Sequence, residues 1–330
     1  MKKILIISHD KIGHQMAGPG IRYHFMAREL AKDFSVTVGF FDKDYIPPLG
    51  FPESYTTQYI PRDSFSESFS DFDIIIAMWL SDEMIEYCHN NNKFIVFDMY
   101  APVPVENLAL FLYSGNPITP HTYQEYLASC VMYDNFLRNG DLFLVSNQRQ
   151  LDLWIGYMFG ADQARVTSYE WRPFFDRFVY APMGIDARMS LKKTNKVLRD
   201  VIPGIGKDDK VLIWTGGIWN WYDGQVLVHA MARLKTTHPE IKLVFFGTKH
   251  HNPNVPEMKE TTRTHDLAVQ LGLLGENVFM QQTWVPYNDR IDYLLEADVA
   301  INTNKPSIES EFSHRTRVLD HILAGLPTIS

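Results

Sequence analysis

Residues 186–210, DARMSLKKTNKVLRDVIPGIGKDDK, interrupt a chain that otherwise alternates between strand-like and helix-like segments. The stretch is polar and basic, and its Pro203, Gly204 and Gly206 favour turns and loops over regular structure. Strand–helix alternation precedes this stretch and begins again after it. The sequence therefore predicts two α/β domains, residues 1–190 and residues 191–330, joined by a linker.

The first half of the chain alternates short apolar runs with segments whose apolar residues recur at helical spacing. The run DIIIAM, for example, is apolar almost throughout, which is typical of a strand buried on both faces of a parallel sheet. Strands are predicted at 3–8, 36–41, 73–78, 93–97, 142–146 and 178–182. Helices are predicted at 20–32, 82–91, 105–113, 121–137 and 148–159.

The second half repeats this rhythm. Strands are predicted at 211–215, 242–246, 278–281, 299–302 and from 328 onward, and helices at 225–234, 262–271, 289–295 and 315–323. Two such series predict two facing, Rossmann-like, doubly wound parallel-sheet domains. Because these domains bind ligands beyond the carboxyl ends of their strands, we expect functional residues in the loops after strands, around an interdomain cleft.

Composition narrows the classes of function. The 330 residues are 45% hydrophobic and carry a net charge of −8, which argues against nucleic acid as the main partner. Cys88 and Cys130 are too few for a disulfide framework or a zinc site. No apolar run is long enough to cross a membrane, and the apolar residues after Met1 are interpreted as the first strand rather than a signal peptide.

The loop after the first strand, HDKIGHQMAGPGIRYH, places Gly18 and Gly20 on either side of Pro19, directly before a helix. Glycines let the backbone approach a ligand, and the free N–H groups of a helix start suit phosphate. A tight strand-to-helix turn explains the same residues equally well. The loop lacks both the Gly-x-Gly-x-x-Gly fingerprint and the Gly-Lys-Ser/Thr of a P-loop.

Three loops of the second half carry unusual residues. TGGIWNWYDGQ (215–225) places Trp219 and Trp221 after Gly217, where they would stack on a sugar or base, or simply pack. GTKHHNPN (247–254) offers the cation Lys249 and a histidine pair, His250 and His251, without a further ligand at metal-binding spacing. TWVPYNDR (283–290) is a turn whose backbone could contact a base edge.

The segment NKPSIESEFSHRTRVLDHILAGLP combines carboxylates, arginines and a helix start. Arginine binds phosphate bidentately, and carboxylates accept hydrogen bonds from sugar hydroxyls. Charges at a helix start more often serve only as caps. Here the segment follows a strand, so we predict a binding role for Glu309, Glu311, Arg315 and Arg317.

These stretches together resemble the retaining glycosyltransferases of family 4, or group 1, which have the GT-B fold. Their N-terminal glycine-rich loop and helix are similar to AGPGIRYHFMAREL, and the end of their first domain is similar to APMGID. Their second domain is similar, in order, to VLIWTGGIWNWYDG, IKLVFFGT, TWVPYNDRIDYLLEADVAIN and RTRVLDHILAGLPTIS. The resemblance covers nearly the whole chain. It implies residues 1–190 as an acceptor-binding domain and 191–330 as a nucleotide-sugar-binding domain.

The resemblance also implies roles for single residues. The backbone of Gly20, with Gly18 beside it, would approach the phosphates of the donor, and Trp284 and Val285 would lie beside its base. Asp320 takes the place of the family's second motif glutamate, which holds the ribose, while the backbone of Arg315, Thr316 and Arg317 would cradle the diphosphate.

Two features depart from the family pattern. The first motif glutamate would fall on Phe312, so Glu309 or Glu311 is the expected substitute near the transferred sugar. The Arg and Lys that usually clamp the diphosphate are replaced by Ile218 and Asp223. The available cations are then Lys249, Arg315 and Arg317, and we interpret the Gly-Gly-Ile-Trp-Asn-Trp loop as a variant form.

The implied reaction is transfer of a sugar from a nucleotide donor to a glycan or lipid-linked acceptor with retention, in cell-surface polysaccharide synthesis. Neither a cofactor nor a divalent metal is expected, and Asp98, after the strand KFIVFD, is expected to orient the acceptor or the sugar. A cytoplasmic protein is expected, with peripheral membrane contact open through the basic residues Arg188, Lys192, Lys193 and Lys196, which a solvated linker would equally explain.

Two alternatives stay open at this point. His9, His14 and His314 suit the acid–base chemistry of a sugar-nucleotide epimerase with a similar fold. The missing Arg/Lys pair would suit a non-catalytic binding module. Because the second domain of the family continues beyond the strand that follows AGLP, we also expect a longer polypeptide, and an incomplete second domain in residues 191–330.

Overall fold

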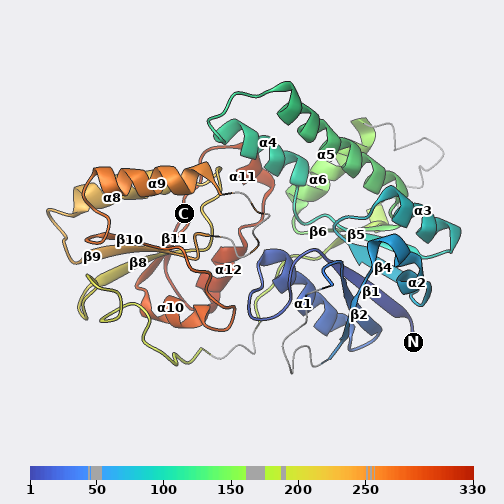
Figure 1. The fold of residues 1–330 in the computed structure, drawn as a ribbon, viewed down its shortest axis with the longest axis horizontal. Coiled ribbons are helices and arrows are strands. Elements are labelled where there is room, and N and C mark those ends of the chain that lie inside the picture. The colour runs from blue at the N-terminus through green and yellow to red at the C-terminus, as the bar shows by residue number, and fades with distance from the viewer. Residues whose placement is uncertain are drawn as a thin grey trace. The chain divides into compact units, whose positions relative to one another are not determined.

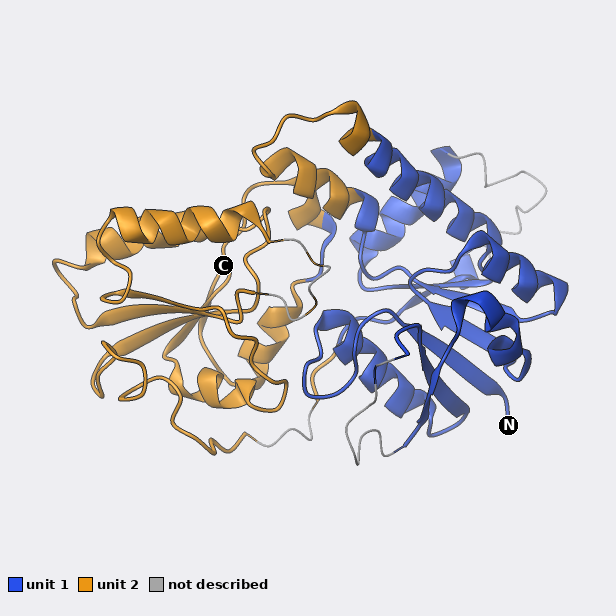
Figure 2. Cartoon of the chain, viewed as in Figure 1, with its two compact units in different colours: residues 1–104, 124–183, 312–314 blue, residues 105–123, 184–311, 315–330 orange. Residues whose placement is uncertain are grey.

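The computed structural model describes residues 1–43, 45, 54–160, 175–186, 191–249, 252, 255 and 257–330. The chain forms two compact units, coloured separately in Figure 2. Unit 1 comprises residues 1–104, 124–183 and 312–314, and unit 2 comprises residues 105–123, 184–311 and 315–330. The predicted division after residue 190 falls beside 187–190, which lie outside the described residues.

Unit 1 is built on a parallel sheet with the strand order β3-β2-β1-β4-β5-β6-β7 (Figure 1). The strands are β1 (Lys3–Ser8), β2 (Ser35–Phe40), β3 (Thr56–Tyr59), β4 (Ile74–Ala77), β5 (Phe94–Asp98), β6 (Leu142–Val145) and β7 (Phe178–Tyr180). The helices of this half of the chain are α1 (Gly18–Leu30), the short 3-10 helix η1 (Arg62–Ser64), α2 (Phe65–Ser70), α3 (Asp82–Asn90), α4 (Val103–Tyr113), α5 (Pro120–Asn139) and α6 (Gln148–Gly160), although most of α4 and the start of α5 belong to unit 2.

The core of unit 1 explains why these strands form. In β1, every residue after the first is buried, and Ile4 aligns with Val36 of β2 on one side and Ile74 of β4 on the other. Large side chains from α2, α3, α5 and α6, including Phe69, Phe136 and Trp154, pack together with the strands in one cluster. Burial on this scale stabilises the sheet by the hydrophobic effect.

Unit 2 contains a second parallel sheet with the order β10-β9-β8-β11-β12. Its strands are β8 (Lys210–Thr215), β9 (Ile241–Phe246), β10 (Val278–Gln281), β11 (Val299–Ile301) and β12 (Thr328–Ile329). Its helices are α8 (Gly224–Leu234), α9 (Lys259–Gln270), α10 (Arg290–Glu296), α11 (Ile308–Phe312) and α12 (Thr316–Leu323). Helices α8 and α9 cover one face of the sheet, and α10 and α12 the other (Figure 1).

Each sheet has a point where the strand order reverses. In unit 1 this point is β1, which pairs with β2 and β4, and in unit 2 it is β8, which pairs with β9 and β11. In open α/β sheets, ligands bind beyond the carboxyl ends of the strands at such points. The predicted doubly wound parallel-sheet architecture of both halves is confirmed, and it directs attention to the loops after β1 and β8.

The two units exchange segments of the chain. All of α4 after its first two residues, the loop after it and the start of α5 (105–123) belong to unit 2, whereas 312–314 belong to unit 1 (Figure 2). Arg263 of α9 donates hydrogen bonds to the carbonyls of Tyr113 (3.2 Å) and Ser114 (3.1 Å), at the C-terminus of α4. These bonds satisfy carbonyls that a helix end leaves open.

Candidate functional site

The loop after β8 and the first turn of α12 meet at the switch point of unit 2. Gly216 has a φ of +82°, a conformation that favours glycine, and its carbonyl accepts a hydrogen bond from Nε1 of Trp214 (3.1 Å). The carbonyl of Gly217 accepts a hydrogen bond from Nη2 of Arg317, on α12, at 2.9 Å. The glycine pair thus lets the end of β8 turn sharply against the start of α12.

Arg315 and Glu309 form a bidentate ion pair. Nη1 and Nη2 of Arg315 each lie 2.6 Å from one carboxylate oxygen of Glu309, whose residue is 0% exposed. The pair is short and charge-assisted, and removal of either partner would leave the other buried and uncompensated. Glu309 and Arg315, both predicted as site residues, are therefore brought together, whereas Glu311 lies exposed on α11.

Arg317 is the second arginine of this cluster. Its guanidinium lies over the rings of Trp214 (4.6 Å) and Tyr222 (4.3 Å), and Arg315 lies over the same Tyr222 ring at 5.2 Å. Burial, and then the charge of Arg315, lower the pKa of Arg317. Its Nη1 is buried and has no hydrogen-bond partner among the described residues. Arg317 therefore keeps one buried donor that no described residue satisfies.

A third titratable group, Glu106 on α4, belongs to the same unit. Burial, then the charge of Glu309, raise the pKa of Glu106 to about 7, and Arg315 opposes this shift. Arg315 and Arg317 thus lie over Tyr222, and the charges of Glu309 and Arg315 also act on the Glu106 carboxyl group. The two carboxyl groups differ, because Glu309 has its own bidentate guanidinium and Glu106 is held toward its neutral form.

The remaining predicted residues of α12 are placed as follows. Thr316 is the first residue of the helix, and Asp320 lies one turn later and forms an ion pair with Arg290 at 2.9 Å. His321 is fully buried, with Nε2 3.2 Å from Oγ1 of Thr215. Burial, and then the charge of Arg317, lower the pKa of His321 to about 4, so it is neutral and ties α12 to the end of β8.

The residues predicted to lie near the donor base and phosphates follow β9 and β10. Lys249 is exposed, and its backbone N–H donates to the carbonyl of Gln282 (3.3 Å), which joins the two loops. Trp284 is half-buried, and Val285 packs against the core beneath α10. The predicted histidine pair, 250 and 251, lies outside the described residues.

The two positions that depart from the family pattern have structural roles. Ile218 is 0% exposed within the core of unit 2, and Asp223 caps α8 by accepting a hydrogen bond from the N–H of Val226 (3.0 Å). Trp219 and Trp221 stack on each other with ring centroids 5.2 Å apart and join the same core. Packing therefore explains this pair of tryptophans without a ligand.

Unit 1 has its own buried ion pair beyond the carboxyl end of its sheet. Nε and Nη2 of Arg22, on α1, donate to the two carboxylate oxygens of Asp98 at 2.6 and 2.7 Å, and the residues are 4% and 1% exposed. The guanidinium lies 4.6 Å from the ring centroid of Tyr100. Asp98, predicted to face a ligand, thus also fastens α1 to the end of β5.

The glycine-rich loop folds around a carboxylate of its own. Oδ2 of Asp10 accepts hydrogen bonds from the N–H groups of Ala17 (2.9 Å) and Gly20 (3.1 Å). A Cβ at Gly20 would meet the carbonyl oxygen of Lys11 at 2.3 Å, whereas a Cβ at Gly18 would meet nothing within 4 Å. The close approach therefore requires glycine at 20, and the N–H of Gly20 is engaged within the protein.

The histidines that suit acid–base chemistry do not share one environment. His14 is exposed, and Nε2 of His9 lies 3.3 Å from the carbonyl of Trp79. His314 belongs to unit 1, where burial and then the charge of Arg22 lower its pKa, and its Nε2 has no hydrogen-bond partner among the described residues. Nε2 of Gln150 holds the neighbouring segment through the carbonyl of residue 312 at 2.9 Å.

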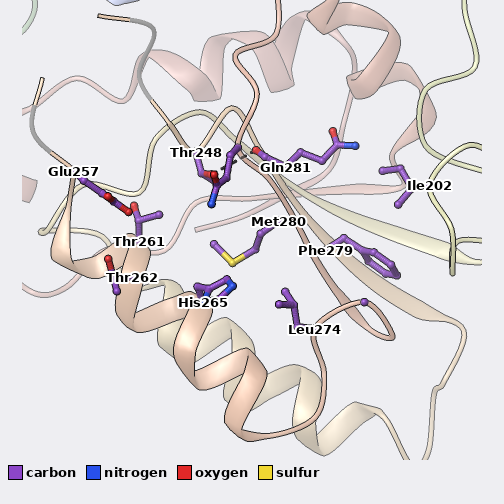
Figure 3. A pocket seen from close by; sticks show the side chains of 12 residues that line it. Ile202, Thr248, Glu257, Thr261, Thr262, His265, Leu274, Phe279, Met280 and Gln281 are labelled. Atoms are coloured by element: carbon purple, nitrogen blue, oxygen red, sulfur yellow. Dashed lines mark hydrogen bonds between the residues drawn. The ribbon is translucent and has the colours of Figure 1, made fainter. Parts of the chain in front are cut away.

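A cavity of about 400 Å³ lies beside the edge strand β10 in unit 2 (Figure 3). Its lining combines polar and apolar side chains from α9, from β10 and from the ends of neighbouring segments, among them Thr248, Thr261, His265, Met280 and Gln281. Figure 3 shows His265 and Met280 side by side within it. None of the predicted site residues lines this cavity, so it is separate from the arginine cluster.

No helix among the described residues is both long and apolar enough to span a bilayer. The same residues contain no group of three or more His, Cys, Asp or Glu arranged to hold a metal ion. Of the basic linker residues, Lys193 forms an ion pair with Glu296 (3.1 Å) and Lys196 with Asp200 (3.2 Å), while residue 188 lies outside the described range.

Sequence reasoning missed Glu106, Arg22 and Tyr222. A signal existed for Glu106, because it is a single carboxyl group in the apolar helix VPVENLALFLY. Arg22 had a weaker signal, as a cation near the start of the helix that follows the glycine-rich loop. Nothing in the sequence pairs Arg22 with Asp98, which lies 76 residues away in the chain.

No family model matches the sequence, and no curated protein matches it either. Among solved structures, the chain is similar to Anabaena HepE in complex with UDP, with 13% identity, a TM-score of 0.59, and coverage of 100% of this chain and 80% of that one. It is also similar to a glycosyltransferase from Rickettsia africae ESF-5, with 13% identity, a TM-score of 0.57, and coverage of 99% and 78%.

A third similar structure is WaaG, a glycosyltransferase involved in lipopolysaccharide biosynthesis, with 15% identity, a TM-score of 0.53, and coverage of 98% and 80%. Identities this low speak for the fold alone. Together with the two parallel sheets, these similarities over almost the full chain show that the protein has the GT-B fold.

Proposed function

We propose that the protein is a retaining glycosyltransferase that moves a sugar from a nucleotide-diphosphate donor to a glycan or lipid-linked acceptor. The observation that carries this proposal is Arg317, a half-buried cation at the switch point of unit 2 whose buried Nη1 has no partner among the described residues, within the GT-B fold. A diphosphate offers the negative charge and the acceptor oxygens that would satisfy this guanidinium.

The proposed chemistry needs little from the protein beyond positioning. As the bond between sugar and diphosphate breaks, negative charge grows on the leaving phosphate. Arg317 and the N–H groups at the start of α12 would stabilise that charge more strongly in the transition state than in the ground state. Glu309 would keep Arg315 in place and stand near the transferred sugar, and Asp320 would face the ribose, as the family resemblance implies.

The similar structures support the donor class and suggest where to begin. The Anabaena structure contains UDP, so uridine nucleotides are the first donors to test on this chain. The similarity to WaaG makes a glycolipid of the cell surface the first acceptor class to test. Neither a metal nor a cofactor is part of the proposed mechanism, which relies on cations of the chain itself.

The test is release of nucleoside diphosphate from UDP-glucose, and from a panel of other nucleotide sugars, by the full chain. A transferase releases the nucleotide slowly in water and faster when glycolipid acceptor is added, and NMR of the product reports its anomeric configuration. Arg317→Met should abolish release while the protein stays folded. Conversion of the donor sugar without acceptor would instead indicate an epimerase.

A donor-binding module without turnover is the second candidate, favoured by one observation. Both terminal nitrogens of Arg315 already bind Glu309. The two positions that usually clamp the diphosphate carry Ile218, a core residue, and Asp223, the cap of α8. Nucleotide binding in the absence of any release, with every donor and acceptor tried, would support this module over the transferase.

A further inference from the structure

Four side chains gather where four neighbouring strands of unit 1 end. The strands β3, β2, β1 and β4 are adjacent in that order, and the last residue of β2 aligns with the last residues of both β1 and β3. The loops that follow the four strands therefore begin at the same edge of the sheet, around its switch point. These loops carry, in chain order, His9, Phe41, Arg62 and Trp79.

The four side chains contact one another and form what we call the aromatic platform. The ring centroid of His9 lies 5.6 Å from that of Phe41 and 5.5 Å from that of Trp79, and it meets Trp79 edge to face at 73°. The guanidinium carbon of Arg62 lies 4.2 Å from the ring centroid of Phe41 and 5.9 Å from that of Trp79. The cation and the rings thus hold one another in place, although they come from four separate loops.

One side of the platform is packed and the other is open. Phe41 and Trp79 pack against the core of unit 1 and are only half-buried, while His9 and Arg62 are exposed. Within the part of the chain that the structure describes, the guanidinium of Arg62 has no hydrogen bond or ion pair, and Nε1 of Trp79 has no acceptor. The platform therefore presents aromatic surface together with N–H donors that the protein itself leaves unused.

This combination fits the chemistry of a sugar ring. A pyranose has an apolar face of C–H groups, which packs on an aromatic ring, and a rim of hydroxyl groups, which accept hydrogen bonds from N–H donors. Ligand sites commonly pair an apolar or aromatic wall with a few polar groups that fix orientation, and in α/β sheets they lie at the switch point. Trp79 and Phe41 supply the wall here, and Arg62, His9 and Nε1 of Trp79 supply the donors.

The charges around the platform favour a neutral ligand over a phosphate. Three cations and three carboxylates lie at or next to the four platform positions, so their formal charges cancel: Lys11, Lys43 and Arg62 against Asp10, Asp42 and Asp63. A phosphate site would need an excess of positive charge. A sugar needs donors and acceptors rather than net charge, and this edge of the sheet offers both.

We propose that the aromatic platform of His9, Phe41, Arg62 and Trp79 binds a sugar ring of the acceptor glycan. The ring would pack on Trp79 while Arg62 and His9 donate hydrogen bonds to its hydroxyl groups. This inference rests on the proposed transferase in assigning the sugar to the acceptor. The binding of a sugar by unit 1 is itself independent of the donor site on unit 2.

The experiment is titration of a panel of methyl glycosides into the full chain, followed by saturation-transfer difference NMR. The panel contains the α and β methyl glycosides of glucose, galactose, mannose and N-acetylglucosamine. The variants are Trp79→Leu, Trp79→Phe and Arg62→Met. Arg138→Met, which removes an exposed arginine of α5, is the matched control. UDP is titrated into the same proteins by calorimetry.

At least one glycoside should bind the wild type and Arg138→Met equally. Trp79→Leu should weaken it about fivefold through loss of the ring, and Trp79→Phe should recover most of this loss. Arg62→Met should weaken it about tenfold through loss of a charge-assisted hydrogen bond. The affinity for UDP should stay unchanged in every variant. Because Arg62 is exposed, its variant should fold normally and keeps the test valid if Trp79→Leu folds poorly.

The possible failures can be told apart. If the glycoside binds Arg62→Met and Trp79→Leu as tightly as the wild type, or if these variants weaken UDP instead, the platform is not a site for the acceptor sugar. If no glycoside of the panel binds but UDP does, the platform proposal is wrong and the donor site stands. If a glycoside binds as expected and no nucleoside diphosphate binds, the donor site is wrong and the platform stands.

Discussion

Breaking the ion pair between Glu309 and Arg315 should destabilise unit 2 far more than an ordinary surface substitution. The two short bonds of 2.6 Å and the side-chain exposures of 1% for Glu309 and 15% for Arg315 define a buried pair. Truncating one partner of such a pair costs about 3–5 kcal/mol, because the other charge stays buried. The residual exposure of Arg315 places Glu309→Gln near the lower end, at about 3 kcal/mol.

Scanning calorimetry of the full chain measures this effect. A loss of about 3 kcal/mol in a unit of this size lowers the melting temperature by about 6–12 °C. Glu311→Gln, on the same helix but exposed, should cost less than about 1 kcal/mol. The double variant Glu309→Gln/Arg315→Met should lose less than the sum of its single variants, because the two side chains act as one unit. A loss below 1 kcal/mol in Glu309→Gln would refute the reasoning.

Three further changes test separate parts of the structure. In the folded protein Glu106 has a pKa of about 7, against an ordinary value of 4.5, so its neutral form stabilises the fold fully below pH 4.5 and this stabilisation is lost as the pH rises through 7. Because Glu106 is partly exposed, the loss is limited to about 2 kcal/mol. The melting curves at pH 5 and pH 8 should differ for the wild type and converge for Glu106→Gln. Gly20→Ala should destabilise unit 1 by more than about 1 kcal/mol through its 2.3 Å contact with the carbonyl oxygen of Lys11, whereas Gly18→Ala should change stability by less than about 0.5 kcal/mol, and equal denaturation midpoints for the two would contradict the close-approach argument. Asp223→Ala should cost about 1 kcal/mol through loss of the α8 cap, and Asp223→Asn should recover most of it in the same denaturation assay.

The strands of both sheets were predictable because burial on both faces leaves a nearly continuous apolar run. KILIIS and DIIIAM therefore gave β1 and β4 to within a residue or two. The sequence did not reveal β3, because TTQY is short, partly polar and lies at the edge of its sheet. Strands that are only half-buried lose the apolar signal on which such predictions depend.

The site was predictable as a set of positions and not as a set of contacts. Ligands of α/β sheets bind beyond the carboxyl ends of the strands, and this preference together with the family resemblance selected Glu309, Arg315 and Arg317. In the structure Arg315 and Arg317 lie over Tyr222, and Glu309 binds Arg315. The same reasoning offered Arg315 and Arg317 as equivalent cations. Only three-dimensional contacts distinguish them, since a carboxylate saturates the guanidinium of Arg315, whereas Arg317 has a donor that no residue in the described part of the chain satisfies.

The membership of residues 105–123 in unit 2 was also beyond sequence reasoning. The periodicity of VPVENLALFLY predicts a helix but not which core that helix joins. Contacts of Arg263 and Asn220 with the helix decide this, and they come from segments more than a hundred residues away. Long-range polar contacts of this kind leave no periodic signal in a single sequence.

The most direct measurement is the affinity of the wild type and of Arg317→Met for matched uridine nucleotides, UDP and UMP, by calorimetry. If Arg317 is the cation for the diphosphate, the wild type should prefer UDP, or the corresponding diphosphate of another base. Because Arg317→Met loses one charge-assisted hydrogen bond to a phosphate, its affinity for that diphosphate should be about tenfold to a hundredfold lower than that of the wild type. Its affinity for the monophosphate should change little. Equal affinities of the two proteins for the diphosphate would contradict the assignment of this cluster as the donor site.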